Sequence, residues 1–302
     1  MTGLPMAGKR SIRDARAGRL MFFMTSACAL IVVFMAAGLL IKSFPVLRAN
    51  SPAQILFSDS WSPLKGEFGM LAFIAGTVWV TGLSALIAMP VSLFSAIYLS
   101  EYAPSWLRKI SRPFMDVLAG IPSVVFGVWG ILIIVPLVRD CIAPFFGVYS
   151  SGYSILAASI VLAVMVFPII IQITIEVFHS IPGELRDASL SLGATKWQTI
   201  KLVLLRKALP GIIAANVLGF SRAFGETMAV LMVAGNIPAI PHSPLDAGYP
   251  LPALIANNYG EMLSIPLYDS ALMLAALVLF LIVIMFNLLS RYILSRINLR
   301  AA

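Results

Sequence analysis

The stretch SRAFGETMAV, from Ser221 to Val230, places Arg222 and Glu226 in the middle of an apolar segment that runs from about residue 208 to 235. A charged side chain at bilayer depth is costly unless it is paired or faces a polar cavity. Side chains four residues apart share one face of a helix, so we expect the two charges to pair there. The stretch is therefore a candidate lining for a polar pathway, and the alternative is an ion pair that only holds helices together.

The composition around this stretch is that of an integral membrane protein. Of the 302 residues, 60% are hydrophobic and 11% are charged, which leaves too little polar surface for a soluble globule. Six apolar runs are long enough to cross a bilayer, and three of them should be kinked by Pro90, Pro122 and Pro168. The runs cover residues 20–41, 70–99, 113–138, 153–178, 208–235 and 270–289.

The positive charges predict the orientation of these spans. Of the 21 Lys and Arg residues, 16 lie in the N-terminal tail of residues 1–19, in the loops after the second and fourth spans, and at the C-terminal end. Four lie on the opposite side, and Arg222 completes the count. By the positive-inside rule both termini are expected in the cytoplasm. The net charge of +8 is then mostly a signal of topology, and we expect no nucleic-acid binding.

Enzyme and cofactor chemistry is not indicated by the sequence. Two cysteines far apart and two histidines give neither a disulfide framework nor the spacing of a metal site. No complete phosphate-binding loop, catalytic triad or HExxH pattern is present. We therefore expect no metal, no cofactor and no enzymatic activity in this chain. Uphill transport would need energy from a partner or from an ion gradient.

The loop of residues 179–207 after the fourth span contains a short amphipathic helix. Pro182 and Gly183 should end the span, a helix should follow from about Glu184 to Leu192, and Gly193 should stop it. Leu185, Ala188 and Leu192 would share one apolar face. From the residues alone, that face is covered either by the lipid surface or by a partner protein.

One part of this loop resembles a known motif. The run DASLSLG, Asp187–Gly193, resembles the EAA motif of ABC-importer permeases, in which a short helix fits a cleft in the ATPase subunit. Here Asp187 replaces Glu, Ser189 replaces Ala, and Arg206 stands where the family usually has Pro. The resemblance implies an ATPase contact made by the following residues: Glu184, Asp187, Ala188, Leu192 and Gly193.

Two further stretches sharpen the resemblance. SRAFGETMAVLMVAGN, residues 221–236, and AGIPSVVFGVWG, residues 119–130, are similar to stretches of phosphate-transporter permeases of the PstC type. That family implies an all-α membrane protein with six transmembrane helices and the type I ABC-importer permease fold. It implies a first helix at 20–41 after the cytoplasmic basic tail, and a permease core of five helices at 70–292.

The same resemblance implies the partners and the location. These are a second, PstA-like permease that completes the translocation pathway, two cytoplasmic ATPase subunits and an extracytoplasmic phosphate-binding protein. The expected location is the inner membrane of a bacterial cell, with lipid around the spans. The external loops 42–69 and 237–269 are both candidate docking sites for the binding protein.

The chemistry of the charged stretch agrees with an anion as substrate. Arg222 can offer a fork of donors to a tetrahedral oxyanion. Near neutral pH phosphate carries a proton and sulfate does not. The carboxylate of Glu226 could accept a hydrogen bond from that protonated phosphate oxygen and would repel sulfate. Ser221, Thr227 and Ser123 are further polar groups for the path, unless their hydroxyls bond back to helix carbonyls.

Three other functions compete with a phosphate importer subunit. Permeases for sulfate or molybdate share the fold and the EAA loop. A self-sufficient secondary anion carrier would transport without an ATPase. A membrane scaffold without a pathway would tolerate the loss of Arg222 and Glu226.

Overall fold

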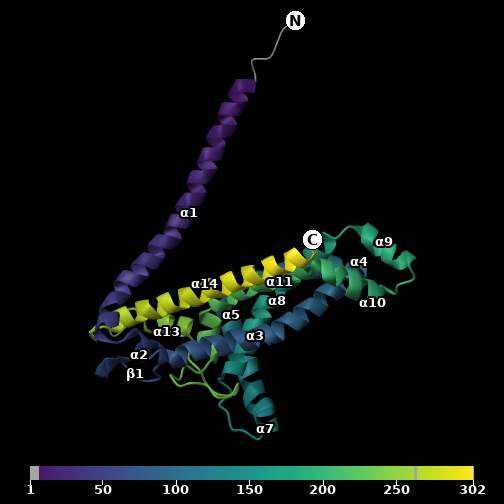
Figure 1. Cartoon of the computed structure of the whole chain (residues 1–302). Helices are drawn as coiled ribbons and strands as arrows, with labels where there is room; N and C mark the ends of the chain where they lie inside the picture. Colours follow the sequence, from purple (N-terminus) through teal and green to yellow (C-terminus); the bar gives the residue numbers. More distant parts are fainter. Residues whose placement is uncertain (1–6, 262–263, 302) are drawn as a thin grey trace.

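The computed structural model describes residues 7–261 and 264–301, and the expected six-helix membrane architecture is confirmed in them. Six helical stretches there are long and apolar enough to cross a bilayer. Figure 1 shows most of them packed into an elongated bundle, while the N-terminal helix leaves the bundle at an angle. The spans are Arg16–Ala49, Leu71–Tyr102, Ser123–Phe145, Ile155–His179, Lys196–Phe224 and Tyr268–Arg296.

Several spans are built from more than one helical segment, because π-helical turns interrupt the α-helices. Before the third span, the elements are α1 (Ala7–Ala49), α2 (Pro52–Phe57), β1 (Trp61–Ser62), the 3-10 turn η1 (Pro63–Lys65), β2 (Glu67–Phe68), α3 (Leu71–Ile97), η2 (Tyr98–Tyr102) and α4 (Ser105–Gly120). The third and fourth spans contain α5 (Ser123–Trp129), η3 (Gly130–Ile134), α6 (Val135–Leu137), η4 (Val138–Ile142), α7 (Ala143–Phe145) and α8 (Ile155–His179). The remaining elements are α9 (Gly183–Ser191), α10 (Lys196–Thr199), η5 (Ile200–Leu204), α11 (Leu205–Phe224), α12 (Met228–Val233), α13 (Leu251–Asn258) and α14 (Tyr268–Ala301).

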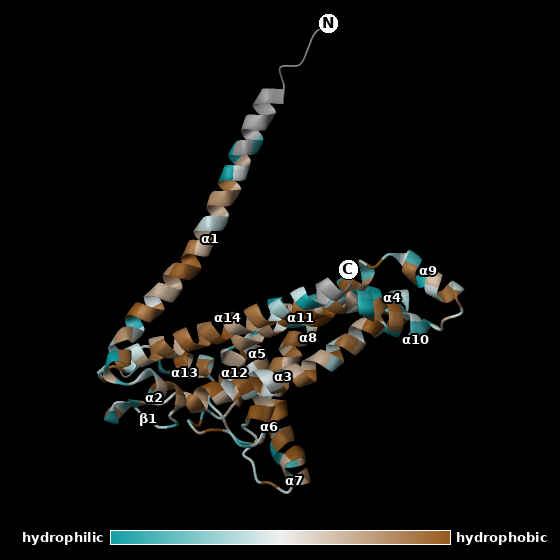
Figure 2. Cartoon of the chain, in the orientation of Figure 1, coloured by the Kyte–Doolittle hydropathy of each residue, from teal (hydrophilic) through white to brown (hydrophobic). Residues whose placement is uncertain are grey.

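The two ends of the bundle differ in character. At one end, α2 and the antiparallel pair β1–β2 form a cap in which the Trp61 ring lies 4.9 Å from the Phe73 ring and 6.2 Å from the Tyr268 ring, centroid to centroid. At the other end lie α9, α10 and the C-terminal part of α14 (Figure 1). Figure 2 shows hydrophilic residues gathered at this second end, with hydrophobic residues between the ends. The polar and apolar zones are those expected for a chain that crosses a bilayer.

α8 is the central helix of the bundle, packing against α3 and α11. Its residues Val161, Leu162 and Val166 are buried. Close approach of α11 depends on Gly219, because a Cβ there would lie 2.7 Å from Cγ1 of Ile170 and 2.8 Å from Cγ1 of Val166. Small residues at such contacts are how membrane helices gain packing without a hydrophobic driving force.

The third span is displaced from the expected range of residues 113–138. Residues 113–120 belong to α4, a separate amphipathic helix, and the span itself begins at Ser123. The physical reason is Pro122, which has no backbone N–H and pushes the preceding residue out of the helical region; Ile121 has φ −65° and ψ 130°. Pro90 and Pro168, in contrast, lie inside α3 and α8, which continue through them.

The fifth span is also displaced from the expected range of 208–235. It begins at Lys196 and ends at Phe224, so the predicted loop of residues 179–207 is shorter than expected. Thr195 and Gln198 form a capping box that starts the helix well before the apolar run. Gly225 ends it, and its amide donates to the carbonyl of Arg222.

The N-terminal helix is longer than the expected span of residues 20–41. The basic tail was expected to end at residue 19; residues 1–6 lie outside the described part of the chain, and from Ala7 onward the tail is already part of α1. The helix also continues through Pro45 to Ala49, where Ser43 and Val46 are buried at its base. Most of its other described side chains are exposed in the isolated chain.

Enlarging Gly219 should separate α8 from α11. Gly219→Val overfills a packed contact, a change that typically costs about 1–3 kcal/mol, so the thermal unfolding midpoint in detergent should fall. Gly82→Val is the matched control in α3, because a Cβ at Gly82 meets nothing within 4 Å. Equal midpoints for the two variants would contradict the assigned contact.

Candidate functional site

The site is built around a break in the helix between α11 and α12. α11 ends at Phe224, Gly225 has φ −91° and ψ −3°, and α12 begins at Met228. The amides of Gly225 and Glu226 bond to the carbonyls of Arg222 and Ala223 at 3.1 and 3.2 Å. The segment predicted as one continuous helix is therefore two, with a short turn that carries Glu226 and Thr227.

Glu226 faces the interior of the bundle at this break. Its side chain lines a small cavity together with Thr77 and Thr81 of α3 and with Pro250 and Pro252 near the start of α13. Thr77 and Thr81 lie about 9 and 15 Å along α3 from its first residue, at the usual rise per residue of a helix. The cavity therefore lies beside the first half of the second span, a helix long enough to cross a bilayer.

The expected pairing of Arg222 with Glu226 is wrong. Both residues belong to the described part of the chain, and the ion pairs found there do not join them. The reason is the helix break, because four-residue spacing brings two side chains to one face only while the helix continues. Arg222 instead lies on the outer surface of the isolated chain, whereas Glu226 is half-buried.

The three hydroxyl residues of the candidate site have different environments. Ser221 donates to the carbonyl of Val217 at 2.8 Å and lies 3.1 Å from Oδ1 of Asn287 in α14. Thr227 donates to the carbonyl of Gly225 at 3.1 Å. The sequence left open whether these hydroxyls face the path or donate to nearby backbone carbonyls. In the structure, the hydroxyls of Ser221 and Thr227 donate to backbone carbonyls.

Ser123 belongs to the second sequence stretch, which the fold brings to the first. It begins α5, which packs on α12. The contact is close at Gly127, where a Cβ would lie 3.3 Å from Cα of Ala229 and would overlap Sδ of Met232 at 2.5 Å. Residues 119–130 and 221–236 thus form one packed unit although they are far apart in the sequence.

The predicted short helix near the other end of the bundle is present as α9, Gly183–Ser191. Gly193 follows it with φ +82°, the left-handed region that favours glycine, so the predicted stop is confirmed. Glu184, Asp187 and Ala188 are exposed, and Leu192 is 89% exposed. The expected apolar face shared by Leu185, Ala188 and Leu192 is not formed. Leu185 packs against the core cluster that contains Phe178, whereas the other two side chains are exposed.

Sequence reasoning missed the ion pair that holds α9 in place. Nη2 of Arg186 lies 2.9 Å from Oε1 of Glu101, in the π-helical turn at the end of α3. The two side chains are only 24% and 10% exposed. The sequence does show an acidic residue, Glu101, at the end of one apolar run and a basic residue, Arg186, in the loop after the fourth span. No local pattern, however, indicates that two residues so far apart in the sequence are in contact.

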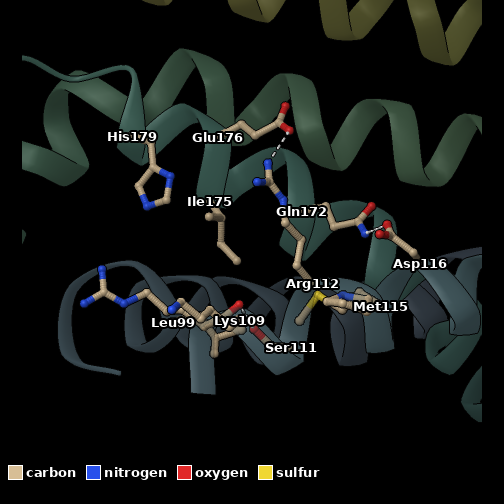
Figure 3. Close-up of a pocket in the computed structure, with 12 residues that line it drawn as sticks. Leu99, Lys109, Ser111, Arg112, Met115, Asp116, Gln172, Ile175, Glu176 and His179 are labelled. Atoms are coloured by element: carbon tan, nitrogen blue, oxygen red, sulfur yellow. Dashed lines mark hydrogen bonds and ion pairs between the residues drawn. The ribbon is translucent and has the colours of Figure 1, made fainter. Parts of the chain in front are cut away.

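A larger cavity of about 530 Å³ lies between α4 and α8 near the same end (Figure 3). Its lining mixes apolar side chains with charged and polar ones: Arg112 lies 3.6 Å from Glu176, and Gln172 donates to Asp116 at 2.6 Å. His179 lines it at the left of the view, and Lys109 also belongs to its lining. Within the described residues, no group of His, Cys, Asp and Glu has the arrangement of a metal site.

Comparison with known proteins gives one consistent result. The family model described as binding-protein-dependent transport system inner membrane component matches residues 88–299. The chain is 40% identical over 280 residues to a probable ABC transporter permease protein, YqgH, of Bacillus subtilis, covering 90% of this chain and 89% of that protein. It is 35% identical to the phosphate transport system permease protein PstC of Xylella fastidiosa, covering 96% of this chain and 94% of the relative. For the probable PstC of Methanocaldococcus jannaschii the identity is 36%, over 78% of each chain.

Solved structures agree on the fold. A chain of the inward-facing MetNI methionine ABC transporter aligns with a TM-score of 0.56 at 20% identity, over 74% of this chain and 93% of that one. A chain of a bacterial alginate ABC transporter aligns with a TM-score of 0.62 at 15% identity, over 94% and 97%. These values support the expected ABC-importer permease fold. With the family model and the relatives, they show that the chain belongs to the family of inner membrane components of binding-protein-dependent transport systems.

Proposed function

We propose that this chain is the transmembrane permease subunit of an ATP-driven phosphate importer. The observation that carries the proposal is that relatives named for phosphate transport match it at 32–36% identity over 78–96% of its length. In this role the chain conducts the substrate and is not itself an enzyme. Those relatives favour phosphate over sulfate or molybdate, and an importer subunit over a self-sufficient carrier.

The proposed contact with the anion is made by Arg222 and the turn that follows it. Arg222 is exposed on the isolated chain at the end of α11, so its guanidinium is available to a tetrahedral oxyanion. Glu226, in the turn after Arg222, supplies a carboxylate that accepts a hydrogen bond from the protonated oxygen of hydrogen phosphate. Ser221, Thr227 and Ser123 are the further polar groups proposed for this path, although the first two hydroxyls already donate to backbone carbonyls.

A second permease subunit, PstA-like, is proposed to complete the path. This proposal is supported by the exposed apolar surface of the isolated chain, which includes most of α1 and the side chains of Val124, Val125 and Val128 on α5. Lipid covers one part of such a surface in an assembled transporter, and a partner subunit covers the part that lines the path.

One of the two proposed ATPase subunits is expected to dock on α9 and its C-terminal turn. The support is geometric: Glu184, Asp187 and Ala188 are exposed, Leu192 is almost fully exposed, and Gly193 fixes the turn that presents them. Leu190 is also exposed, so α9 and its turn present two exposed leucines beside acidic side chains, and exposed apolar groups that gather in one place are typical of a protein-interaction site.

The proposed orientation places α9 and both termini in the cytoplasm of a bacterial cell, within its inner membrane. It rests on the bias of 16 to 4 in Lys and Arg residues. The opposite end, with the cap of α2, β1 and β2 and the segment of residues 237–269, then faces the extracytoplasmic phosphate-binding protein.

A reporter that is active only outside the cytoplasm tests this orientation. Fused after Ala302 it should be silent, and inserted near Asp246 it should be active. Activity at the C-terminal position together with silence near Asp246 would reverse the orientation and would remove α9 from the ATPase side.

Gly193→Val tests the docking of the ATPase on α9. A β-branched residue strongly disfavours the left-handed conformation of this position, so the turn should shift and substrate-stimulated ATPase activity and phosphate uptake should both fall. Gly183→Val is the matched control at the start of α9, where a Cβ meets nothing within 4 Å and φ is not positive. Equal activity of the two variants, at equal amounts in the membrane, would argue against docking here.

Arg222→Gln tests the contact with the anion. Because Arg222 and Glu226 are not paired, the substitution leaves no partner unsatisfied, and loss of a charged hydrogen bond should lower phosphate uptake by about tenfold or more. The protein should still assemble with its ATPase. Arg291→Gln is the control, an exposed arginine near the end of the last span that should leave uptake unchanged.

Glu226→Gln separates the choice of substrate from the rate. It should narrow any preference for phosphate over sulfate, measured by competition for uptake, because Gln can donate to a sulfate oxygen where Glu repels it. Near-normal phosphate uptake by the assembled double variant Arg222→Gln with Glu226→Gln would exclude both residues from the path.

A further inference from the structure

The side chain of Arg186 joins three segments of the chain at the base of α9. Nη2 donates to Oε1 of Glu101 at 2.9 Å and to the carbonyl of Phe178 at 2.9 Å, and Nη1 donates to the carbonyl of Ile181 at 3.0 Å. The guanidinium therefore connects α9 to the end of α8, to the connection between them, and to the last turn of the second span. A planar group with several donors in fixed directions is suited to such a junction.

Glu101 is held from a second direction by the start of the fifth span. Nζ of Lys196 donates to the backbone carbonyl of Glu101 and lies 4.6 Å from the centroid of the Tyr102 ring. The hydroxyls of Ser189 in α9 and Thr199 in α10 are 2.9 Å apart. The turn of Glu101 and Tyr102 thus receives a contact from each side of the loop that carries α9.

The span whose last turn contains Glu101 is also the span that borders Glu226. α3 and the π-helical turn η2 together form one helical span from Leu71 to Tyr102. Near the other end of this span, Thr77 and Thr81 line the small cavity with Glu226. One continuous helical span therefore connects the base of α9 with the proposed path of the anion.

A second ion pair at the same end of the bundle has none of these properties. Arg112 and Glu176 join α4 to α8 at 3.6 Å, with side chains that are 74% and 68% exposed (Figure 3). Solvent screens such a pair, so it contributes little to holding helices together. It provides a natural comparison for the mostly buried pair of Arg186 and Glu101.

We infer that Arg186 and Glu101 are positioning residues that fix α9 to α3, so that a displacement of α9 by the ATPase displaces α3 as well. Without the pair, α9 still presents its exposed residues to the ATPase. A displacement of α9 would then deform the loop around it and would not move α3. The inference rests on the proposed function and adds to it the residues that join the docking helix to the pathway.

The test uses the complete transporter, purified with its partner subunits and placed in lipid vesicles. The measured quantity is the amount of inorganic phosphate delivered per ATP hydrolysed. In Arg186→Gln and Glu101→Gln this ratio should fall by about fivefold or more, the usual size of a coupling between two sites. The ATPase subunits should remain bound in wild-type amounts. Arg186→Lys should lie between, because it keeps the charge but loses the fork of donors.

Arg112→Gln and Glu176→Gln are the matched controls, and both should keep the wild-type ratio. A wild-type ratio of phosphate to ATP in the assembled Glu101→Gln complex would overturn the inference. A different result would also overturn it: the variants lose most of their ATPase subunits, and the complexes that stay intact transport with a wild-type ratio. The second result would mean that the pair only shapes the docking surface. A wild-type complex that hydrolyses ATP but moves no phosphate would contradict the proposed function instead, so the two failures are distinguishable.

Discussion

The hydrocarbon of a bilayer offers no hydrogen-bond partners, so a chain that crosses it must satisfy its own backbone groups. A helix can break at that depth only where protein or a water-filled cavity covers the break. The turn of Gly225–Thr227 is such a break: α3 and the start of α13 lie beside Glu226, while Gly225 is exposed in the isolated chain, where a partner or a water-filled path would cover it. The position of Glu226, the exposure of Arg222 and the packing of α5 on α12 all depend on this one interruption of a membrane-spanning helix.

The sequence was sufficient for the architecture, because apolar runs of bilayer length are a strong signal. The number of spans and the short helix before Gly193 were predicted, the latter from proline and glycine punctuation. Boundaries were less accurate where two signals competed. The apolar run from Ala208 concealed a helix that begins at the capping box of Thr195 and Gln198, and the run around Pro122 concealed the separate amphipathic helix α4.

The candidate site was predicted in its residues but not in its geometry. Four-residue spacing implies a pair only if the helix continues, and a single glycine inside an apolar run is a weak sign that it does not. The opposite error occurred at the other end of the chain. Arg186 was counted as one of many loop cations that set the orientation, yet its side chain is mostly buried against Glu101. Residues so distant in sequence meet only through the packing of α3, α8 and α9, which no local pattern records.

The departure of α1 from the bundle has a consequence for how the protein is made. Within the described residues, the principal packing partner of α1 is α14, which is synthesised after every other described span. The first helix therefore has to remain in the membrane with its sides covered by lipid or by insertion factors while the other spans are synthesised. Contacts between the two ends of a chain form late and slow the final assembly. The subunit is thus most vulnerable to helix mispairing and proteolysis in the interval before α14 is inserted. Substitutions at the base of α1 around Val46 should therefore lower the yield of assembled protein mainly during that interval.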